Sequence, residues 1–503
     1  MDSRKNYVVA VDVGSSEVVI AVGSMAEGGT VNIETVVAEP LTGVSAGLVE
    51  NSQTVAEALR RARVRAEQEV GVAITDAYVT ISGRFVRCAR YTDHVFVEDN
   101  ENRISQRDLA ALRERMLNVK AGAGEVIMDL FPLCYKSDIG TELQNPVGCY
   151  SKQLSSTYNF ILCEDTAKDR LRRVFLDVGI KIRSMFAGAS VMAKSLVTSD
   201  EKEDGVAIVD IGSGVTDLAI YRGGVLCYIA SIPMGGSALN NDILGYDNNI
   251  PSRMVENLKK QCGSAVVELT PDDMIQVRNR GRAIKPIPRL NLAAVIEARM
   301  TDIAEYVWNE IREAGYAKKL GAGIVLTGGG ANLKNVGELF HRITEQEVRV
   351  ACAEIGVATE ALEKYASPSY TMALSLLLHG AEVGPCPVGV LIQRPAEPKT
   401  ELKAEPVKPV EPAQPAKPAQ PKVTPQPQVT PQPQPQPQPI QQPAEPNTLK
   451  GDDDNYGDDI TDGDDDVKPG RGGWFRGWGG KIKRAFTEAF PEPGEDVDGD
   501  DEY

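Results

Sequence analysis

Apolar residues occur along the chain in two patterns, as short continuous runs typical of buried strands and at the spacing of amphipathic helices. Both patterns persist to about residue 392. The run Tyr7–Val13 is apolar at nearly every position, which is typical of a strand buried on both faces. After Asn51 or Ser52, either of which can cap a helix, apolar residues recur at helical spacing until Gly71. This alternation indicates an α/β protein, and 503 residues are too many for one hydrophobic core.

The same two patterns predict further elements. The expected strands are Val18–Val22, Ala77–Ile81, Val126–Leu133 and Tyr158–Cys163. The expected helices are Leu109–Leu117, Asp165–Val178, Pro251–Cys262, Leu290–Ala314 and Ser367–Gly380. Segment 84–157 has a hairpin-like run, a helix and strands of its own, so it has the size of a small inserted α/β subdomain.

A strand followed by Asp-x-Gly and small residues occurs twice, in VAVDVGSSEV (Val9–Val18) and AIVDIGSGVTD (Ala207–Asp217). A buried strand that ends in this way presents a carboxylate beside a turn with free backbone N–H groups, which suits Mg²⁺ and phosphate. One copy often forms nothing more than a strand-ending turn. Two copies that face each other would hold one nucleotide between similar halves, so the duplication favours a nucleotide clamp.

A third glycine-rich turn follows the strand-like run in GIVLTGGGANL (Gly323–Leu333). Only glycine lets the backbone approach a flat ligand this closely with positive φ. A glycine triplet by itself is usually a turn. After the two Asp-x-Gly turns, we expect this one to contact the nucleotide.

Composition narrows the possible functions. About half of the formal charge of −17 lies in residues 394–503, so the preceding part is only mildly acidic and no nucleic-acid partner is expected. The eight cysteines are scattered without a C-x-x-C pair, which argues against metal and redox motifs. The N-terminus shows no signal peptide and no run approaches 18 apolar residues, so we expect no membrane span.

Residues 394–448 are dominated by proline, glutamine, lysine and glutamate, and nine aspartates follow between Asp452 and Asp466. Such a composition cannot bury a core and favours extended polyproline geometry. We expect a spacer, extended further by the self-repelling acidic run. The alternative is a ligand for a proline-binding domain of the SH3 type.

The segment WFRGWGGKIKRAFTEAF (Trp474–Phe490) has aromatic and aliphatic residues on one side of a helix and mainly basic residues on the other. This pattern predicts a helix that lies in a membrane interface. Three glycines should keep the segment unfolded until it binds lipid. The alternative is a helix that docks on the folded part. The expected membrane residues are Trp474, Phe475, Trp478, Lys481, Ile482, Lys483, Phe486 and Phe490.

The duplicated Asp-x-Gly turns and the later glycine triplet resemble the actin-like ATPase superfamily. Three further motifs, together with the terminal amphipathic segment, resemble the FtsA family of bacterial cell-division proteins. These motifs are ISGRFVR (Ile81–Arg87), NPVGCYS (Asn145–Ser151) and IPMGGSALNNDI (Ile232–Ile243). The resemblance covers about residues 5–390 and the terminal helix.

The resemblance implies an actin-like ATPase fold in which two halves, each with a five-stranded mixed sheet flanked by helices, enclose ATP. The expected parts are a first half (1–83 and 158–198), an inserted subdomain (84–157), a second half (199–243 and 320–392) with a small subdomain (244–319), a disordered linker (393–469), a membrane helix (470–490) and an acidic tail (491–503).

The resemblance also implies which residues bind ATP and Mg²⁺. Asp12 and Asp210 would hold magnesium through water, and Glu256 and Lys259 would lie near the ribose or base. The phosphates would contact Gly14, Ser15, Ser16, Gly212, Ser213, Gly214 and Thr216. The adenosine would lie against Gly328, Gly329 and Gly330.

By the same resemblance, the protein is expected to be an adaptor that polymerises, binds the C-terminal tail of the tubulin-like FtsZ and recruits later division proteins. It would be a peripheral protein on the cytoplasmic face of the inner membrane at midcell, held there by anionic lipid. The FtsZ tail would dock on the small subdomain, where Arg280, Arg289 and Arg299 are candidate contacts.

Three features depart from the family pattern. Glu17 stands where the family usually has a lysine, and a carboxylate there would oppose phosphate binding. Phe186 occupies the position, in an expected connecting helix, of a water-orienting Glu or Gln. We therefore expect ATP binding with slow or absent hydrolysis. The seven carboxylates between Glu492 and Glu502 should weaken attraction to anionic lipid.

Two other functions fit the same fold. A sugar or acetate kinase would need a catalytic aspartate in a substrate cleft and no lipid-binding tail. An actin-like platform protein of a pilus or secretion machine shares the type of inserted subdomain. The proline-rich spacer and the terminal amphipathic segment disfavour both alternatives.

Overall fold

The computed structural model describes residues 6–25, 30–143, 145–247, 249–278, 284–358 and 363–390. These residues belong to the first of two compact units, residues 1–402, and the second unit is residues 403–503. The expected linker, membrane helix and acidic tail therefore lie outside the described residues. No helix within the described ranges is long and apolar enough to cross a membrane.

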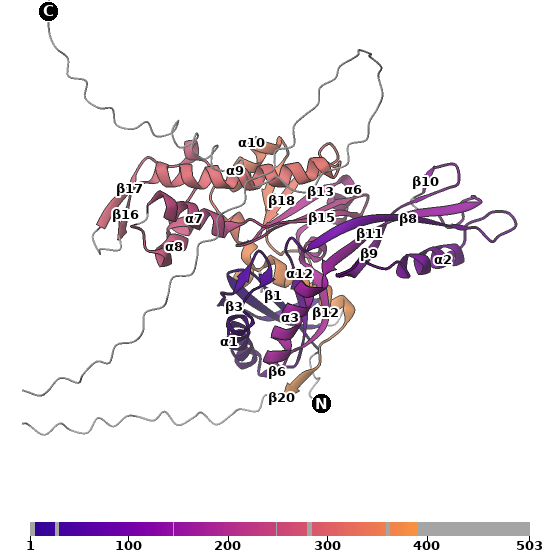
Figure 1. The fold of residues 1–503 in the computed structure, drawn as a ribbon, viewed down its shortest axis with the longest axis horizontal. Coiled ribbons are helices and arrows are strands. Elements are labelled where there is room, and N and C mark those ends of the chain that lie inside the picture. The colour runs from indigo at the N-terminus through magenta and orange to yellow at the C-terminus, as the bar shows by residue number, and fades with distance from the viewer. Residues whose placement is uncertain are drawn as a thin grey trace, which may run out of the picture. The chain divides into compact units, whose positions relative to one another are not determined.

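The first half is built on a five-stranded sheet (Figure 1). In sheet order its strands are β12 (Lys181–Ala187), β7 (Asp76–Ile81), β1 (Tyr7–Val13), β2 (Glu17–Met25) and β3 (Val31–Pro40). Residues Val8–Val11 of β1 are fully buried, as their unbroken apolar run predicts. Helix α1 (Ser52–Val70) packs on β2 and β3, and α3 (Asp165–Val178) lies beside it. Short strands β4 (Val44–Ser45) and β5 (Leu48–Val49) form a hairpin before α1.

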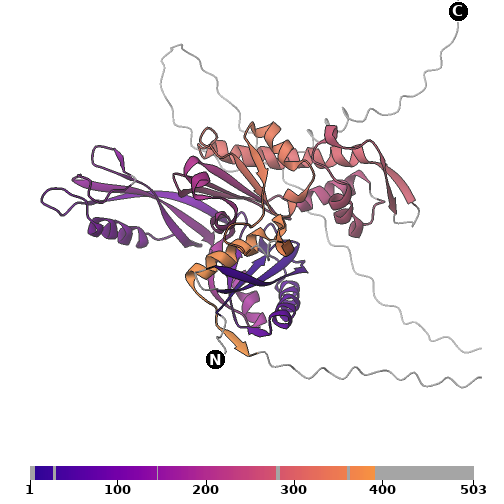
Figure 2. The same ribbon diagram turned by 180° about the vertical axis from the view of Figure 1, so that it is seen from behind.

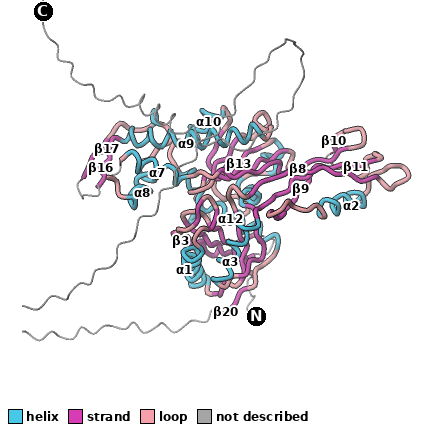
Figure 3. The backbone as a smooth tube through the Cα atoms, in the orientation of Figure 1, coloured by secondary structure: helices cyan, strands magenta, loops and turns pink. Residues whose placement is uncertain are grey.

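The sheet of the second half, whose central strand β13 is labelled in Figure 3, repeats this topology. In sheet order its strands are β15 (Val225–Ile232), β14 (Thr216–Arg222), β13 (Val206–Ile211), β18 (Ile324–Thr327) and β19 (Val348–Val350). In each sheet the strand that carries the Asp-x-Gly motif is central, antiparallel to its hairpin partner and parallel to the strand on its other side. The duplicated sequence pattern thus corresponds to a duplicated sheet, which confirms the expected fold class.

Short helices link the halves, and others complete the second half. The links are α4 (Gly188–Val191), α5 (Ala193–Leu196) and α6 (Ser199–Asp204). After β18 come η2 (Gly329–Asn332) and α10 (Val336–Thr344).

The small subdomain combines three helices with a two-stranded ribbon. Its elements are α7 (Gly236–Tyr246), α8 (Ser252–Cys262), η1 (Val267–Leu269), β16 (Met274–Arg278), β17 (Ile284–Pro288) and α9 (Arg289–Glu313). The expected start of this subdomain at residue 244 falls inside α7 and is wrong, because α7 is one continuous helix that packs on α8 and α9.

The inserted subdomain is a four-stranded sheet with one helix. Its elements are β8 (Val86–Phe96), α2 (Gln106–Leu117), β9 (Glu125–Lys136), β10 (Glu142–Leu143) and β11 (Gln153–Glu164). The expected end at residue 157 is wrong, because β11 stays paired with β8 as far as Cys163. Segment 158–163 therefore belongs to this subdomain. The register of β11 against β9 shifts between Thr157 and Tyr158, at the point where the sequence pattern suggests a break.

The C-terminal elements of the described chain return to the first half. Helix α12 (Thr371–Val383) packs on β1, β2 and β7, and β20 (Val388–Val390) pairs with β6 (Val72–Ile74) (Figure 2). The 3-10 helix η3 (Pro368–Tyr370) still contacts the second half, so the assignment of all of 320–392 to that half is wrong from α12 onward. Gly380 does not end the helix, which continues to Val383, because Gly380 provides space for a neighbouring ring.

The inserted subdomain also contacts β15, an edge strand of the second sheet. The buried Asn159 Nδ2 donates to the carbonyls of Leu226 (3.1 Å) and Cys227 (2.7 Å). Arg90 adds a hydrogen bond to the hydroxyl of Tyr316 (3.3 Å). Side-chain donors thus occupy backbone acceptors that an edge strand would otherwise leave exposed.

We predict opposite effects for alanine at two helical glycines. A Cβ at Gly380 would overlap the ring of Tyr78, which is fully buried, whereas a Cβ at Gly245 in α7 meets nothing within 4 Å. Gly380→Ala should lower the free energy of unfolding by about 1–3 kcal/mol through overpacking. Gly245→Ala should leave it unchanged or raise it by up to about 1 kcal/mol, because alanine favours helix. Thermal and denaturant unfolding of the two variants provides the measurement, and equal effects would contradict the packing at Tyr78.

Candidate nucleotide site

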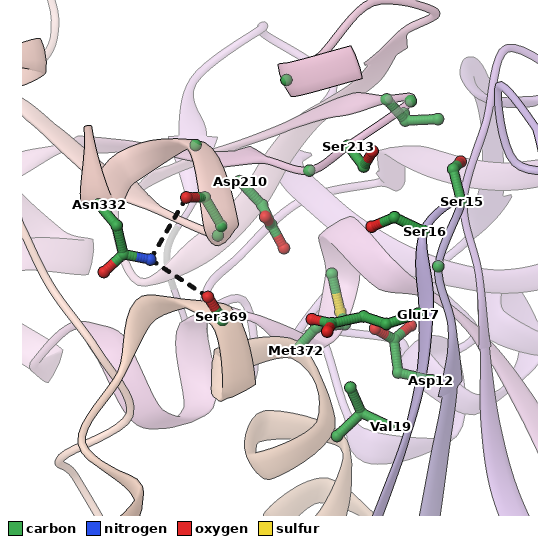
Figure 4. A pocket seen from close by; sticks show the side chains of 18 of the residues that line it. Asp12, Ser15, Ser16, Glu17, Val19, Asp210, Ser213, Asn332, Ser369 and Met372 are labelled. Carbon is green, nitrogen blue, oxygen red and sulfur yellow. Dashed lines mark hydrogen bonds between the residues drawn. The ribbon is translucent and has the colours of Figure 1, made fainter. Parts of the chain in front are cut away.

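A cavity of about 850 Å³ lies where the two halves meet the small subdomain. Figure 4 shows side chains from the first half, the second half and the start of α12 directed into this space. The predicted residues that line it are Asp12, Gly14, Ser15, Ser16, Asp210, Gly212, Ser213, Gly214, Glu256, Lys259, Gly328, Gly329 and Gly330. The structure therefore brings together residues that are more than three hundred positions apart in the sequence.

The two Asp-x-Gly turns have the same backbone geometry. The N–H of Gly14 donates to the carbonyl of Glu17 (3.0 Å), and the N–H of Gly212 donates to the carbonyl of Val215 (2.9 Å). Each bond closes a tight turn between a central strand and its hairpin partner. Within the described residues, the N–H groups of the two residues that follow each glycine have no acceptor, so both turns offer free donors to an anion.

The two turns also lie against each other. A Cβ at Gly214 would collide with the Oγ of Ser15. The second turn therefore approaches the first so closely that only glycine fits at position 214. Gly235, which follows β15, approaches the carbonyl of Gly212 in the same way. These contacts leave no room for larger residues, which explains the glycines on this side of the cavity.

Three aspartates, Asp12, Asp210 and Asp217, line the cavity. Asp12 accepts a hydrogen bond from Thr80 Oγ1 (2.6 Å), and Asp217 accepts one from the hydroxyl of Ser231. Burial raises the pKa of Asp12 and of Asp217 to about 6 in each case. The hydrogen bonds lower both pKa values, but by less than burial raises them. Burial, followed by the charges of Asp217 and Asp12, raises the pKa of Asp210 well above its usual value.

The glycine triplet packs directly on the second turn. Gly328 has a φ of 83°, and a Cβ there would collide with the Oδ1 of Asp210. The side chain of Asn332 donates to the carbonyl of Gly329 (3.3 Å) and to the hydroxyl of Ser369 (3.1 Å), as Figure 4 shows. The triplet is thereby fixed to the segment that precedes α12.

Charged residues of α8 form another wall. Lys259 Nζ lies 2.7 Å from Glu256 and donates to the carbonyl of Gly236 (2.9 Å). Glu256 also accepts from the amide of Asn240 (2.7 Å) and lies 3.4 Å from Lys260. The predicted pair Glu256 and Lys259 is therefore preformed in the cavity wall.

Two predicted positions, Thr216 and Phe186, have other surroundings. Thr216 is fully buried, does not line the cavity and donates to the carbonyl of Met234 (2.8 Å), because the first residue of β14 faces the sheet interior. Phe186 lies in β12 and not in a connecting helix, and its ring packs edge-on against His379 with centroids 4.5 Å apart. Because Phe186 does not line the cavity, it gives no reason for slow hydrolysis.

The candidate arginines for partner binding are engaged within the chain. Arg289 pairs with Asp273 at 2.5 Å, at the base of the ribbon. Arg299 is largely buried and bonds both Asp242 on α7 (2.6 Å) and Asp302 (3.0 Å). These contacts hold elements of the small subdomain together. Arg280 lies outside the described residues.

Sequence reasoning missed several cavity residues. Asp217 stands inside the second motif, and Lys260 is adjacent to a predicted contact, so both could have been found there. Other polar cavity residues were not predicted as contacts, although Ser82, Asn240 and Asn332 lie inside motifs that the sequence analysis names. These other residues are Thr80, Ser82, Asn240, Asn332, Ser367 and Ser369.

Comparison with known proteins gives consistent results. The family described as "Cell division protein FtsA" matches residues 207–375. The chain is 29% identical over 388 residues to the cell division protein FtsA of Escherichia coli (strain K12), which covers 75% of this chain and 91% of that protein. It is 28% identical over 359 residues to FtsA of Buchnera aphidicola subsp. Baizongia pistaciae (strain Bp), with coverage of 69% and 84%.

Among solved structures, a PilM-PilN type IV pilus biogenesis complex matches with a TM-score of 0.52 and 14% identity. The match covers 74% of this chain and 98% of that chain. A likeness at such low identity shows the fold alone, so the sequence relatives support cell division over the pilus alternative.

Two sheets of one topology, joined at a cavity by facing glycine turns, define an actin-like ATPase fold. The sequence relatives then indicate which of the proteins with this fold the chain is similar to. The chain is similar to FtsA cell-division proteins over about three quarters of its length.

We predict that the buried aspartates make the protein more stable as the pH falls from about 7 toward 4. The folded protein binds protons that the unfolded chain releases near pH 4, because the pKa of Asp217 is raised to about 6 on folding. Asp217→Asn should therefore raise the free energy of unfolding at pH 7.5 by about 1–3 kcal/mol and reduce its pH dependence between 4 and 6. Unfolding curves across this pH range measure both effects.

Asp108 provides the matched control. It is also buried, but hydrogen bonds from Ser105 outweigh burial and lower its pKa. Asp108→Asn should destabilise the protein at pH 7.5, with the loss shrinking as the pH falls below about 4. If both variants shift stability in the same direction, the assignment of the Asp217 pKa is wrong.

Proposed function

We propose that this protein is a nucleotide-dependent adaptor of cell division, which binds ATP with Mg²⁺, polymerises and connects FtsZ to the inner membrane. The observation that carries the proposal is the pair of facing turns with free N–H donors around one cavity, in a chain similar to FtsA proteins over 75% of its length. That similarity supports the remaining roles, which include recruitment of later division proteins at midcell.

The cavity suits a triphosphate nucleotide. The turns at Ser15 and Ser213 would bind phosphate oxygens through backbone N–H groups and hydroxyls. The glycine triplet leaves a flat surface for the adenosine, and Glu256 and Lys259 would lie near the ribose or base. Each contact uses a feature already present in the described residues.

A magnesium ion would be held mainly through water and phosphate oxygens. In the described part of the chain, no three Asp, Glu, His or Cys side chains are arranged to coordinate a metal directly. Mg²⁺ commonly keeps several water ligands and needs few protein carboxylates. Asp12 and Asp210, which both reach the cavity, are the proposed partners of those waters.

We predict that Asp210→Asn reduces ATP affinity in the presence of Mg²⁺ by tenfold or more, while leaving affinity in EDTA nearly unchanged or raised. The lost carboxylate orients a water of the ion but repels phosphate when the ion is absent. Titration of the purified protein with fluorescent ATP, with and without Mg²⁺, measures the effect. Absence of ATP binding by the natural protein in both buffers would contradict the proposed nucleotide site.

The terminal segments supply the proposed membrane attachment. Segment 470–490 would lie in the lipid interface through its aromatic residues, with its lysines over anionic headgroups. The proline-rich segment of residues 394–448 would allow the folded part to stand at a distance from the membrane, on the order of 150–200 Å at full extension. The FtsZ tail would dock on the small subdomain, where Arg289 lies beside the ribbon.

We predict that deletion of 470–490 abolishes sedimentation with anionic vesicles, whereas deletion of 491–503 strengthens it severalfold at low salt. The second effect follows because the seven carboxylates near the helix repel the same headgroups that attract its lysines. High salt should remove the gain. Unchanged affinity of the second variant at low salt would contradict a masking role of the tail.

Retention of FtsZ tail peptide on immobilised protein, together with a midcell band of the tagged protein in dividing cells, tests the adaptor role itself. A protein that binds neither FtsZ nor vesicles would not be an adaptor, even if it bound ATP.

A further inference from the structure

The carboxylate of Glu17 occupies the cavity without a partner among the described residues. Glu17 begins β2, and its carbonyl accepts the hydrogen bond that closes the first turn, so its position is determined by that turn. Its side chain extends into the cavity beside Asp12 (Figure 4). Three other cavity carboxylates have bonded partners, which are Thr80 for Asp12, Ser231 for Asp217 and Lys259 for Glu256.

Asp210 also lacks a bonded partner in the described part of the chain, but the proposed magnesium ion accounts for it. No such role exists for Glu17. It brings a further negative charge to a cavity that already holds four carboxylates, and it does so next to the turn that would bind phosphate.

Of the two lysines that line the cavity, Lys260 is the one less constrained by other contacts and so better able to move toward the charge of Glu17. It stands on α8, which belongs to the other half, and its side chain is 69% exposed with a single contact, to Glu256 at 3.4 Å. The neighbouring Lys259 is 13% exposed and is held by both Glu256 and the carbonyl of Gly236. Lys260 can therefore exchange one anion for another with little rearrangement.

Electrostatics within the cavity support a link between these two residues. Burial raises the pKa of Glu17, and Lys260 lowers it more than Asp12 or Glu256 raises it. The two side chains are not in contact in the structure, so the attraction acts across the cavity, through the space that a nucleotide would occupy.

We propose that Glu17 makes the cavity discriminate against the terminal phosphate of a nucleoside triphosphate, and that Glu17 and this phosphate compete for Lys260. This inference rests on the nucleotide binding proposed above. A fixed negative charge near the phosphates opposes every added phosphate charge, and a triphosphate carries more charge than a diphosphate. The natural protein is therefore less selective for ATP over ADP than the same cavity would be without the charge of Glu17.

Neutralisation of Glu17 without a change of shape tests the proposal. In Glu17→Gln, the ratio of ATP affinity to ADP affinity should rise about threefold to tenfold, as expected for removal of one partly screened charge from a cavity. Glu17→Lys should raise the ratio further. Both nucleotides are titrated into the purified full chain in excess Mg²⁺, and thermal unfolding confirms that each variant is folded.

Glu114→Gln is the matched control, because it removes the same charge from α2, at an exposed position outside the cavity. Its ATP-to-ADP ratio should equal that of the natural protein. A change of similar size in this control would show that the effect of Glu17 is not local, and would overturn the proposal.

A double-mutant cycle with Lys260→Gln tests the competition. Lys260→Gln should weaken ATP binding more in the Glu17→Gln background than in the natural protein, because Lys260 is then fully available to the phosphates. Additive effects would overturn the role assigned to Lys260.

An unchanged ratio in folded Glu17→Gln and Glu17→Lys would overturn the role of Glu17 while leaving nucleotide binding intact. Failure of the natural protein to bind either nucleotide would instead overturn the proposed nucleotide site, and this inference with it.

Discussion

Three aspartates repel one another in a single cavity, and the two sheets hold them there. Asp12 and Asp210 each stand at the end of a central strand whose preceding residues are fully buried, and Asp217 lies at the start of the hairpin partner. The position of a strand within its sheet is set by its neighbours on both sides, so each carboxylate is fixed within its own half. Burial and mutual repulsion raise their pKa values, and a cation in the cavity relieves the same repulsion.

The glycine turns follow from the same constraint. The free N–H donors of the two turns compensate for the carboxylates by attracting an anion, so the cavity presents positive backbone dipoles beside negative side chains. A magnesium nucleotide would match both, with its cation beside the carboxylates and its phosphates beside the N–H donors. The close approach of Gly214 to Ser15 places the two sets of donors around one ligand.

The halves are tied together by more than the segment that links them. Helix α12 and strand β20 return to the first half after the chain has completed the second sheet. The inserted subdomain, which belongs covalently to the first half, bonds to the edge strand of the second through Asn159. The two halves are therefore held together at α12, β20 and Asn159 as well as through the linking segment.

Local signals in the sequence determined a large part of this structure. Helix α1 begins at the capping residue Asn51 and ends at Gly71, as the sequence predicts, because caps act within a single turn. The repeated Asp-x-Gly pattern identified the cavity, because two copies after matching strands place their turns at corresponding positions of the two sheets. The FtsA-like motifs predicted the similarity to FtsA proteins that the comparison found, because such motifs are local in the sequence.

Only the tertiary structure decided which segments share a core. It placed 158–163 in the inserted sheet, returned α12 to the first half and gave Thr216 a buried carbonyl as its partner. Strand and helix patterns specify that a face is buried but not what buries it, because apolar contact is not directional. The partners of Arg299 and the isolation of Glu17 depend in the same way on residues distant in sequence, whose proximity arises only when the sheets pack.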